Sequence, residues 1–232
     1  MNEFRANYRP GADQTRIVDK HANILFDDSF AINGQGDLSR PEIDRGPLRD
    51  ILLDSVQPDT VVWGSQFVSL DEQNGVFKIE FKNGTSAFAD IIIAADGANS
   101  KLRKYITPIK PFYSGVTTVE GAVYDSANNS PNVHKLLNGG KIFALDDEKS
   151  LIVSSKGDGS LAFYTGCKTS ETWADDSSID FSSKAAVHAW FIREYLGWDN
   201  IWRNFMKMPA RRLPRDHNIA CLLTRPGRRY PI

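Results

Sequence analysis

Residues 90–103 read DIIIAADGANSKLR, and this stretch decides which fold the chain adopts. Residues 91–95 form an apolar run that no charge interrupts, a pattern typical of a strand buried in the middle of a sheet. We therefore expect a buried strand over residues 88–95 that runs straight into the dipeptide Asp96-Gly97. Glycine adopts positive φ without steric cost, so Asp-Gly suits a tight turn. The stretch predicts a strand, a tight turn and then a helix.

The residues after this turn are polar and basic. Ser100 is placed to cap the helix that we expect to follow, and Lys101 and Arg103 lie beside it. A strand, turn and helix in this order point backbone N–H groups beyond the carboxyl end of the strand, where they stabilise an anion such as a pyrophosphate. A strand that ends in Asp-Gly before a serine cap is also common in turns that bind no ligand. The pattern alone therefore leaves open whether this is an anion site or an ordinary turn.

The residues before this stretch predict a β-meander. Strands are expected over residues 60–63 and 67–70, and residues 77–82 alternate between apolar and charged side chains. The dipeptide Asn83-Gly84 favours a type I′ hairpin turn into the returning strand, because both of its residues tolerate positive φ. Further upstream, the opening forty residues predict loops and short strands.

A helix is expected to begin just after Arg45 and to stop near Pro58. Leu48 and Leu52 have helical spacing in this segment. They would anchor the helix to the core and thereby hold the guanidinium of Arg45 at a fixed place.

Residues 115–163 contain several further strand candidates, which predicts a mostly antiparallel sheet. A helix capped by Ser182 or Ser183 and ending at Gly197 is expected next. Aromatic side chains lie on this helix and just beyond it, and such a cluster belongs to a protein core in most cases. The turns of the sheet are expected at residues 125–132, 138–140, 146–147 and 157–159. The aromatic cluster contains Trp190, Phe191, Tyr195, Trp198 and Trp202.

The composition is that of an ordinary globular protein. The 232 residues are 41% hydrophobic and 25% charged, with a formal net charge of -1. Because the net charge is close to zero, a nucleic-acid partner is not indicated. No apolar run is long enough to cross a bilayer, so a membrane is not indicated either, and we expect a cytoplasmic protein. Cys167 and Cys221 lack the spacing of a metal site or a disulfide framework. The histidines are interpreted as structural or surface residues; they are His21, His134, His188 and His217.

Residues 90–103 resemble the Asp-Gly motif of the group A flavoprotein monooxygenases, the para-hydroxybenzoate hydroxylase superfamily. In that family the motif lies beside the flavin pyrophosphate and is implicated in NADPH use. Residues 40–53, RPEIDRGPLRDILL, resemble the family's second signature, whose arginine contacts the cofactor and matches Arg45. A surface ion pair with Asp44 or Asp50 is the alternative role for this arginine. The resemblance implies FAD and NADPH as cofactors, with four cofactor-binding residues: Arg45, Asp96, Gly97 and Arg103.

Five short segments follow one another in an order and spacing typical of one group within the superfamily; they are residues 61–63, 93–97, 137–140, 172–173 and 198–199. In these segments the chain most resembles the tetracycline-inactivating flavin monooxygenases, which are antibiotic-resistance enzymes. The resemblance implies Glu120, Lys141 and Phe143 as substrate-binding residues. The drug-inactivating members carry Gln and Arg at the positions of Glu120 and Lys141, and a His at the position of Ala162. A site built for specific polar partners rejects ligands that leave those partners unpaired, so these differences argue against tetracycline itself. A different planar aromatic or polyketide-like substrate is expected.

The resemblance places the chain in the α+β class, within an α/β flavoprotein family. Residues 1–108 are expected to form a partial FAD-binding domain with the helix, the β-meander and the Asp-Gly motif. Residues 109–206 would form a substrate domain, a mostly antiparallel sheet flanked by a few helices. Residues 207–232 are rich in arginine and proline and are expected to form an irregular basic tail. A reading-frame shift near Pro209 and a basic arm that binds phosphate or another chain are the two explanations of this tail.

The family's Gly-rich ADP-binding unit and its later flavin-contact segment have no counterpart in the sequence, so we interpret the chain as a fragment with weakened FAD affinity. A complete relative is expected to be monomeric and to use NADPH, FAD and O₂ to hydroxylate an aromatic substrate. The flavin carries that chemistry, so no catalytic residue and no metal ligand are expected in this chain. Three hypotheses remain: a monooxygenase polypeptide, a non-catalytic module that sequesters a flat hydrophobic ligand, and an inactive truncated product.

Overall fold

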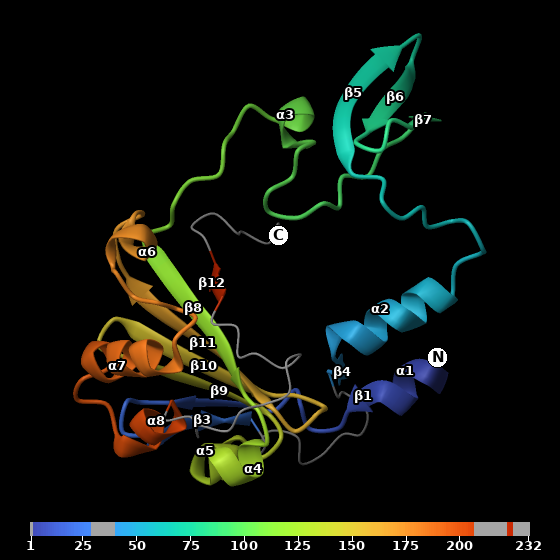
Figure 1. Ribbon diagram of the computed structural model, residues 1–232. Helices are drawn as coiled ribbons and strands as arrows, with labels where there is room; N and C mark the ends of the chain where they lie inside the picture. Colours follow the sequence, from blue (N-terminus) through green and yellow to red (C-terminus); the bar gives the residue numbers. More distant parts are fainter. Residues whose placement is uncertain (1, 29–39, 207–221, 225–232) are drawn as a thin grey trace. The chain divides into compact units, whose positions relative to one another are not determined.

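The computed structural model describes residues 2–28, 40–206 and 222–224 (Figure 1). These residues fall into two compact units. The first, which we call the sheet unit, contains the described residues up to 49 and from 115 onward, and the second, the meander unit, contains residues 50–114. The expected FAD-binding domain, residues 1–108, is not one of these two units, because residues 15–27 pair with strands of the main sheet.

The main sheet contains seven strands among the described residues, in the order β12-β8-β11-β10-β9-β2-β3. All neighbouring pairs in this sheet are antiparallel except β2 with β9, which is parallel. The prediction of a mostly antiparallel sheet is therefore confirmed. Its strands are β2 (Thr15–Val18), β3 (Ile24–Asp27), β8 (Val116–Val123), β9 (Lys141–Asp146), β10 (Lys149–Ser155), β11 (Leu161–Lys168) and β12 (Leu222–Thr224).

Helices α7 (Lys184–Glu194) and α8 (Asn200–Phe205) lie on one side of this sheet (Figure 1). The predicted cap of the first of these helices is confirmed, since the Ser183 hydroxyl oxygen accepts a hydrogen bond from the Ala186 N–H at 3.3 Å. The carboxylate of Asp199 caps the second helix by accepting from the Ile201 N–H at 2.8 Å. A short helix, α6 (Trp173–Asp176), precedes them.

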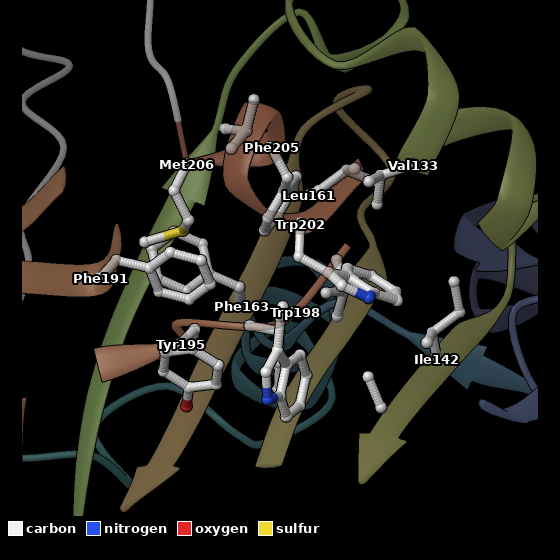
Figure 2. Packing of buried hydrophobic residues seen from close by; sticks show 14 of the residues in the cluster. Val133, Ile142, Leu161, Phe163, Phe191, Tyr195, Trp198, Trp202, Phe205 and Met206 are labelled. Carbon is white, nitrogen blue, oxygen red and sulfur yellow. The ribbon is translucent and has the colours of Figure 1, made fainter. Parts of the chain in front are cut away.

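The aromatic side chains of these helices form the core against the sheet, as Figure 2 shows. Tyr195 stacks on Phe191 with ring centroids 4.3 Å apart, and its hydroxyl donates to the Ser150 carbonyl oxygen at 2.8 Å. Burial raises the pKa of Tyr195, so its hydroxyl keeps the proton that it donates. Burial also raises the pKa of the Cys167 thiol beside it. The prediction of an aromatic core is confirmed, because all five predicted rings are buried: Trp190, Phe191, Tyr195, Trp198 and Trp202.

The segment expected to be a turn at residues 125–132 is helical instead. It contains α4 (Ser126–Asn129) and the start of α5 (Pro131–Leu137). Pro131 is at the start of α5, where a backbone N–H has no partner within the helix, so proline is tolerated there. This proline could have indicated the helix from the sequence. The Ser126 hydroxyl lies 2.8 Å from His134 Nδ1, which gives that histidine the structural role expected of it.

The meander unit contains a three-stranded sheet of β5 (Phe67–Gln73), β6 (Val76–Phe81) and β7 (Ser86–Ala89), paired in that order. The type I′ turn lies at Asn74-Gly75, whose φ values are 56° and 81°. The prediction of such a turn at Asn83-Gly84 is wrong, because of these two residues only Gly84 has positive φ. The Asn83 side chain accepts a hydrogen bond from the Thr85 N–H at 3.1 Å, which stabilises a longer loop in place of the two-residue turn.

Two further strand predictions in the meander unit are wrong. Residues 60–63 form turns and bends, and β7 ends at Ala89, so residues 91–95 are not a strand. The apolar run is exposed instead of buried, with Ile91 at 80% and Ile93 at 87%. No strand among the described residues lies beside the run, and an unpaired segment has neither ladder hydrogen bonds nor a sheet face to bury it.

Helix α2 (Arg45–Asp54) already includes Arg45, which was expected just before its start, and it ends short of the predicted stop. None of its residues is buried, and Leu52 is 57% exposed, so the expected anchoring by Leu48 and Leu52 is not found. Before it, α1 (Asn2–Asn7) leads into a small two-stranded sheet of β1 (Tyr8–Arg9) and β4 (Glu42–Ile43). No helix in the described ranges is long and apolar enough to span a bilayer.

Trp202 provides a test of the aromatic core. It is fully buried, and its indole N–H donates to the Lys20 carbonyl oxygen at 3.0 Å, which ties α8 to the segment after β2. Trp202→Ala is expected to lower the free energy of unfolding by about 3–5 kcal/mol. Trp63, which is 72% exposed, is the matched control, and Trp63→Ala should change stability by no more than about 0.5 kcal/mol. Urea unfolding followed by circular dichroism measures both, and equal losses would contradict this account of the core.

Candidate functional site

Asp96 and Gly97 open a loop that is held together by its own side chains. Gly97 has a φ of 82°, a backbone conformation that side-chain-bearing residues adopt only at a cost. The Asp96 carboxylate accepts a hydrogen bond from the Lys101 N–H at 2.9 Å. Hydrogen bonds from the Ser100 hydroxyl and from this backbone N–H lower the pKa of Asp96, so the carboxylate is ionised at neutral pH.

The helix expected after Ser100 is shorter than predicted and differently capped. Helix α3 (Arg103–Ile106) is a single turn, and its N-cap position, Leu102, makes no side-chain cap bond. The Ser100 hydroxyl oxygen accepts from the N–H groups of both Leu102 and Arg103 at 3.2 Å. The N–H groups of residues 101–103, where an anion was expected to bind, are therefore occupied by the Asp96 and Ser100 side chains.

Positive charge at this loop comes from side chains. A hollow of about 560 Å³ next to the loop is lined by four cationic residues, and no carboxylate lines it. The Arg103 guanidinium is oriented by donating to the Ala98 carbonyl oxygen at 2.8 Å. The net charge of the whole chain is only -1, so this hollow is a local concentration of positive charge suited to a phosphate. Its lining contains Val68, Ser100, Lys101, Arg103, Lys104, Thr107, Pro108, Ile109, Lys110 and Pro111.

In the sheet unit, the register brings Glu120 and Phe143 into one row across the sheet. Glu120 pairs with Tyr164, Tyr164 with Ile152, Ile152 with Phe143, and Phe143 with Ile17. Side chains in one such row point to the same face. The alternate residues of these strands are buried in the core beneath the helices, so this row lies on the opposite face. We call that face the open face; its row residues are half-buried or, as for Tyr164 at 37%, exposed.

The other two positions expected near a substrate lie on the same open face. Ala162 and Lys141 both pair with Ser154, one on each side, and so belong to the adjacent row. The structure therefore brings together Glu120, Phe143, Lys141 and Ala162, which are spread over three strands of the sequence. Tyr164 and Ile152 share the face and were not predicted, although the alternating pattern of residues 161–168 carries the signal.

Lys141 is already engaged by another side chain. Its ammonium forms an ion pair with Glu42, and Arg9 contacts the same carboxylate at 3.6 Å. Arg9 also contacts Asp44 at 3.5 Å, and Lys156 reaches Asp44 at 4.0 Å. Glu42 and Lys141 are 99 residues apart in the chain, so no local pattern in the sequence could have revealed the pair.

Arg45 and the Asp-Gly loop lie in different units. Arg45 is the first residue of α2, is exposed and belongs to the sheet unit, whereas Asp96, Gly97 and Arg103 belong to the meander unit. The structure therefore brings the three loop residues together within one unit, whereas Arg45 belongs to the other. No group of three or more metal-ligating side chains is found in the part of the chain that the structure describes.

Asp96→Asn tests how the loop is held. The pKa of Asp96 is lowered below 3.8, so the carboxylate stabilises the loop above that pH, and the stabilisation fades as pH falls through the folded-state pKa. The substitution should speed amide hydrogen exchange at Lys101 at about pH 6, and this difference should shrink as the pH is lowered below 3.8. Asp90→Asn, at an exposed position nearby, is the control and should leave that exchange unchanged. A difference that persists in acid would contradict the proposed role of the carboxylate.

Comparison with known proteins identifies the fold. No family model matches the chain. The monooxygenase asqM of Emericella nidulans is 28% identical over 162 residues, which are 64% of this chain and 35% of asqM. The structure of Klebsiella pneumoniae HpxO complexed with FAD and uric acid aligns with a TM-score of 0.68 at 19% identity, over 90% of this chain and 51% of that one. The tetracycline destructase Tet(51) aligns with a TM-score of 0.51 at 17% identity, over 89% of this chain and 50% of that one. The chain thus spans about a third of asqM and about half of these two solved chains, and its described part has the fold of the FAD-dependent monooxygenases.

Proposed function

We propose that the chain serves in an FAD-dependent monooxygenase that hydroxylates a planar aromatic or tetracycline-like substrate with O₂ and NADPH. The observation that carries the proposal is the basic hollow beside the Asp-Gly loop, in a chain whose fold matches that of an FAD complex with a TM-score of 0.68. A sheet face that gathers Glu120, Phe143 and Tyr164 in one row supports a substrate surface.

The residues of the hollow fit the anionic part of a nucleotide cofactor. Lys101, Arg103, Lys104 and Lys110 supply positive charge, and Ser100 and Thr107 supply hydroxyl groups, all in one lining without an acid. Such a set favours the phosphates of FAD or NADPH. Asp96 and Gly97 would act by shaping the loop, because the Asp96 carboxylate itself repels an anion. Arg45, at the start of α2, would be the further cofactor contact in the sheet unit.

When bound, FAD would supply the redox chemistry that uses NADPH and O₂ to oxygenate the substrate. The role of the protein side chains would be to orient. The open face would hold the flat substrate against Phe143 and Tyr164, and Glu120 would be the polar contact that fixes its direction. No side chain of this face is required as a nucleophile or general base in this proposal.

Flavin uptake tests the proposed function directly. Purified chain is titrated with FAD at equilibrium, and a saturable change in flavin absorbance together with NADPH-dependent O₂ consumption is the expected result for the monooxygenase. Binding of an aromatic ligand without flavin uptake would support the sequestering module in its place. We expect the affinity for FAD to be weak, because the chain spans only about half of the FAD-binding chain it matches. A submicromolar dissociation constant for FAD would refute that expectation.

The double variant Lys101→Glu, Lys104→Glu tests the hollow. Reversing two charges of the lining should weaken FAD or NADPH binding by at least about tenfold, and the loss should shrink at high salt. Lys82→Glu, in the β6–β7 loop of the same unit and outside the hollow, is the control. Isothermal titration calorimetry measures the dissociation constant for the unchanged chain, the double variant and the control. An equal loss of affinity in the control would mean that the net charge, and not the hollow, causes the effect.

A further inference from the structure

We propose that the open face of the main sheet selects a planar ligand that carries a positive charge or a hydrogen-bond donor, with Glu120 as its partner, and discriminates against planar carboxylates. The inference names the substrate class of the proposed function, and it rests on that function only in identifying this ligand with the substrate.

Glu120 is the carboxylate of the open face that has no partner among the described residues. Within the described residues it forms no hydrogen bond and no ion pair, although it is only partly exposed. Its neighbours in the strand register are Tyr164 on β11 and Leu222 on β12, with Thr118 and Ala122 on the same face of its own strand, and none of these residues is cationic. A half-buried carboxylate without a partner favours a ligand that donates a hydrogen bond or carries a positive charge.

The lysines of the open face are already neutralised. Lys141 forms its ion pair with Glu42, and Lys168, on the same face of β11 as Tyr164, contacts Glu148 at 3.0 Å. A carboxylate on an incoming ligand would compete with Glu42 for the partly buried Lys141 or with Glu148 for the exposed Lys168, and near Glu120 it would meet a like charge. The face thus offers an acceptor and no unpaired cation among the described residues, which is the reverse of a site built for an aromatic acid.

The shape of the row favours a flat ligand. Tyr164 follows Glu120 directly across the sheet, and Ile152 and Phe143 follow in turn. Three strand spacings separate Glu120 from Phe143, which corresponds to roughly 14 Å. The row from Glu120 to Phe143 is therefore a strip of aromatic and aliphatic side chains with one acid on β8, so a planar molecule lying along it would place one polar group at Glu120.

Two tricyclic probes of opposite charge test the inference. 9-Aminoacridine is a planar cation, and anthracene-9-carboxylate is a planar anion of similar size. Fluorescence titration of the full chain at fixed ionic strength should show tighter binding of 9-aminoacridine by about tenfold or more. Glu120→Gln keeps the shape of the side chain and removes its charge, so it should abolish most of this preference. Glu120→Lys should reverse it.

Matched variants locate the effect. Glu171→Gln removes an exposed carboxylate of the same unit that lies outside the row, and it should leave the preference unchanged. Tyr164→Ala should weaken both probes alike, because it removes the platform and not the charge. Near-ultraviolet circular dichroism verifies that the core of each variant is intact. Equal affinity for the two probes, absence of binding of both, or a preference retained in Glu120→Gln would each overturn the inference.

The outcome is separable from that of the proposed function. A chain that takes up no flavin but loses its cation preference in Glu120→Gln would refute the monooxygenase and keep the selectivity of the open face. A chain that binds flavin and consumes O₂, but shows no effect of Glu120→Gln on probe binding, would keep the monooxygenase and refute the selectivity.

Discussion

The alternation of side chains across the main sheet is the constraint on which the rest of the sheet unit depends. Every second residue of β8 to β11 enters the core beneath α7 and α8, and the residues between them face the other way. A register slip of one residue would bury Glu120 and expose Phe163. The aromatic core, anchored by Tyr195 on Ser150 and Trp202 on Lys20, makes such a slip costly and thereby fixes which side chains the open face presents.

Ion pairs decide which of those side chains is available for a ligand. The small sheet of β1 and β4 brings Arg9, Glu42 and Asp44 to the start of β9, where Lys141 is held. A cation that is bound internally is a poor partner for an external anion, because the internal pair must first be broken. The ion pair with Glu42 therefore matters more for ligand preference at position 141 than the presence of a lysine there.

The meander unit shows the same principle on a smaller scale. Asp96 and Ser100 accept hydrogen bonds from the N–H groups of residues 101–103, so these three donors are not available to a ligand, and positive charge comes from the lysines and Arg103 of the hollow. Both units thus separate the groups that hold the backbone from the groups that face outward. The hollow carries positive charge and the open face carries an acid, which suits a phosphate at one and a donor-bearing ring at the other.

The sequence by itself determined the antiparallel sheet, the Ser183 cap, the aromatic core and the conformation at Gly97, because each depends on local alternation, capping or φ preference. It also placed Glu120, Phe143, Lys141 and Ala162 near one another through family resemblance alone. Only the tertiary structure decided that they share one face, since pairing register joins strands far apart in the chain. Whether an apolar segment is buried also depends on the strands beside it. Residues 91–95 have the apolar pattern of a central strand but lie outside the sheets, because no described strand lies beside them. The pairing of Lys141 with Glu42, across 99 residues, has the same cause.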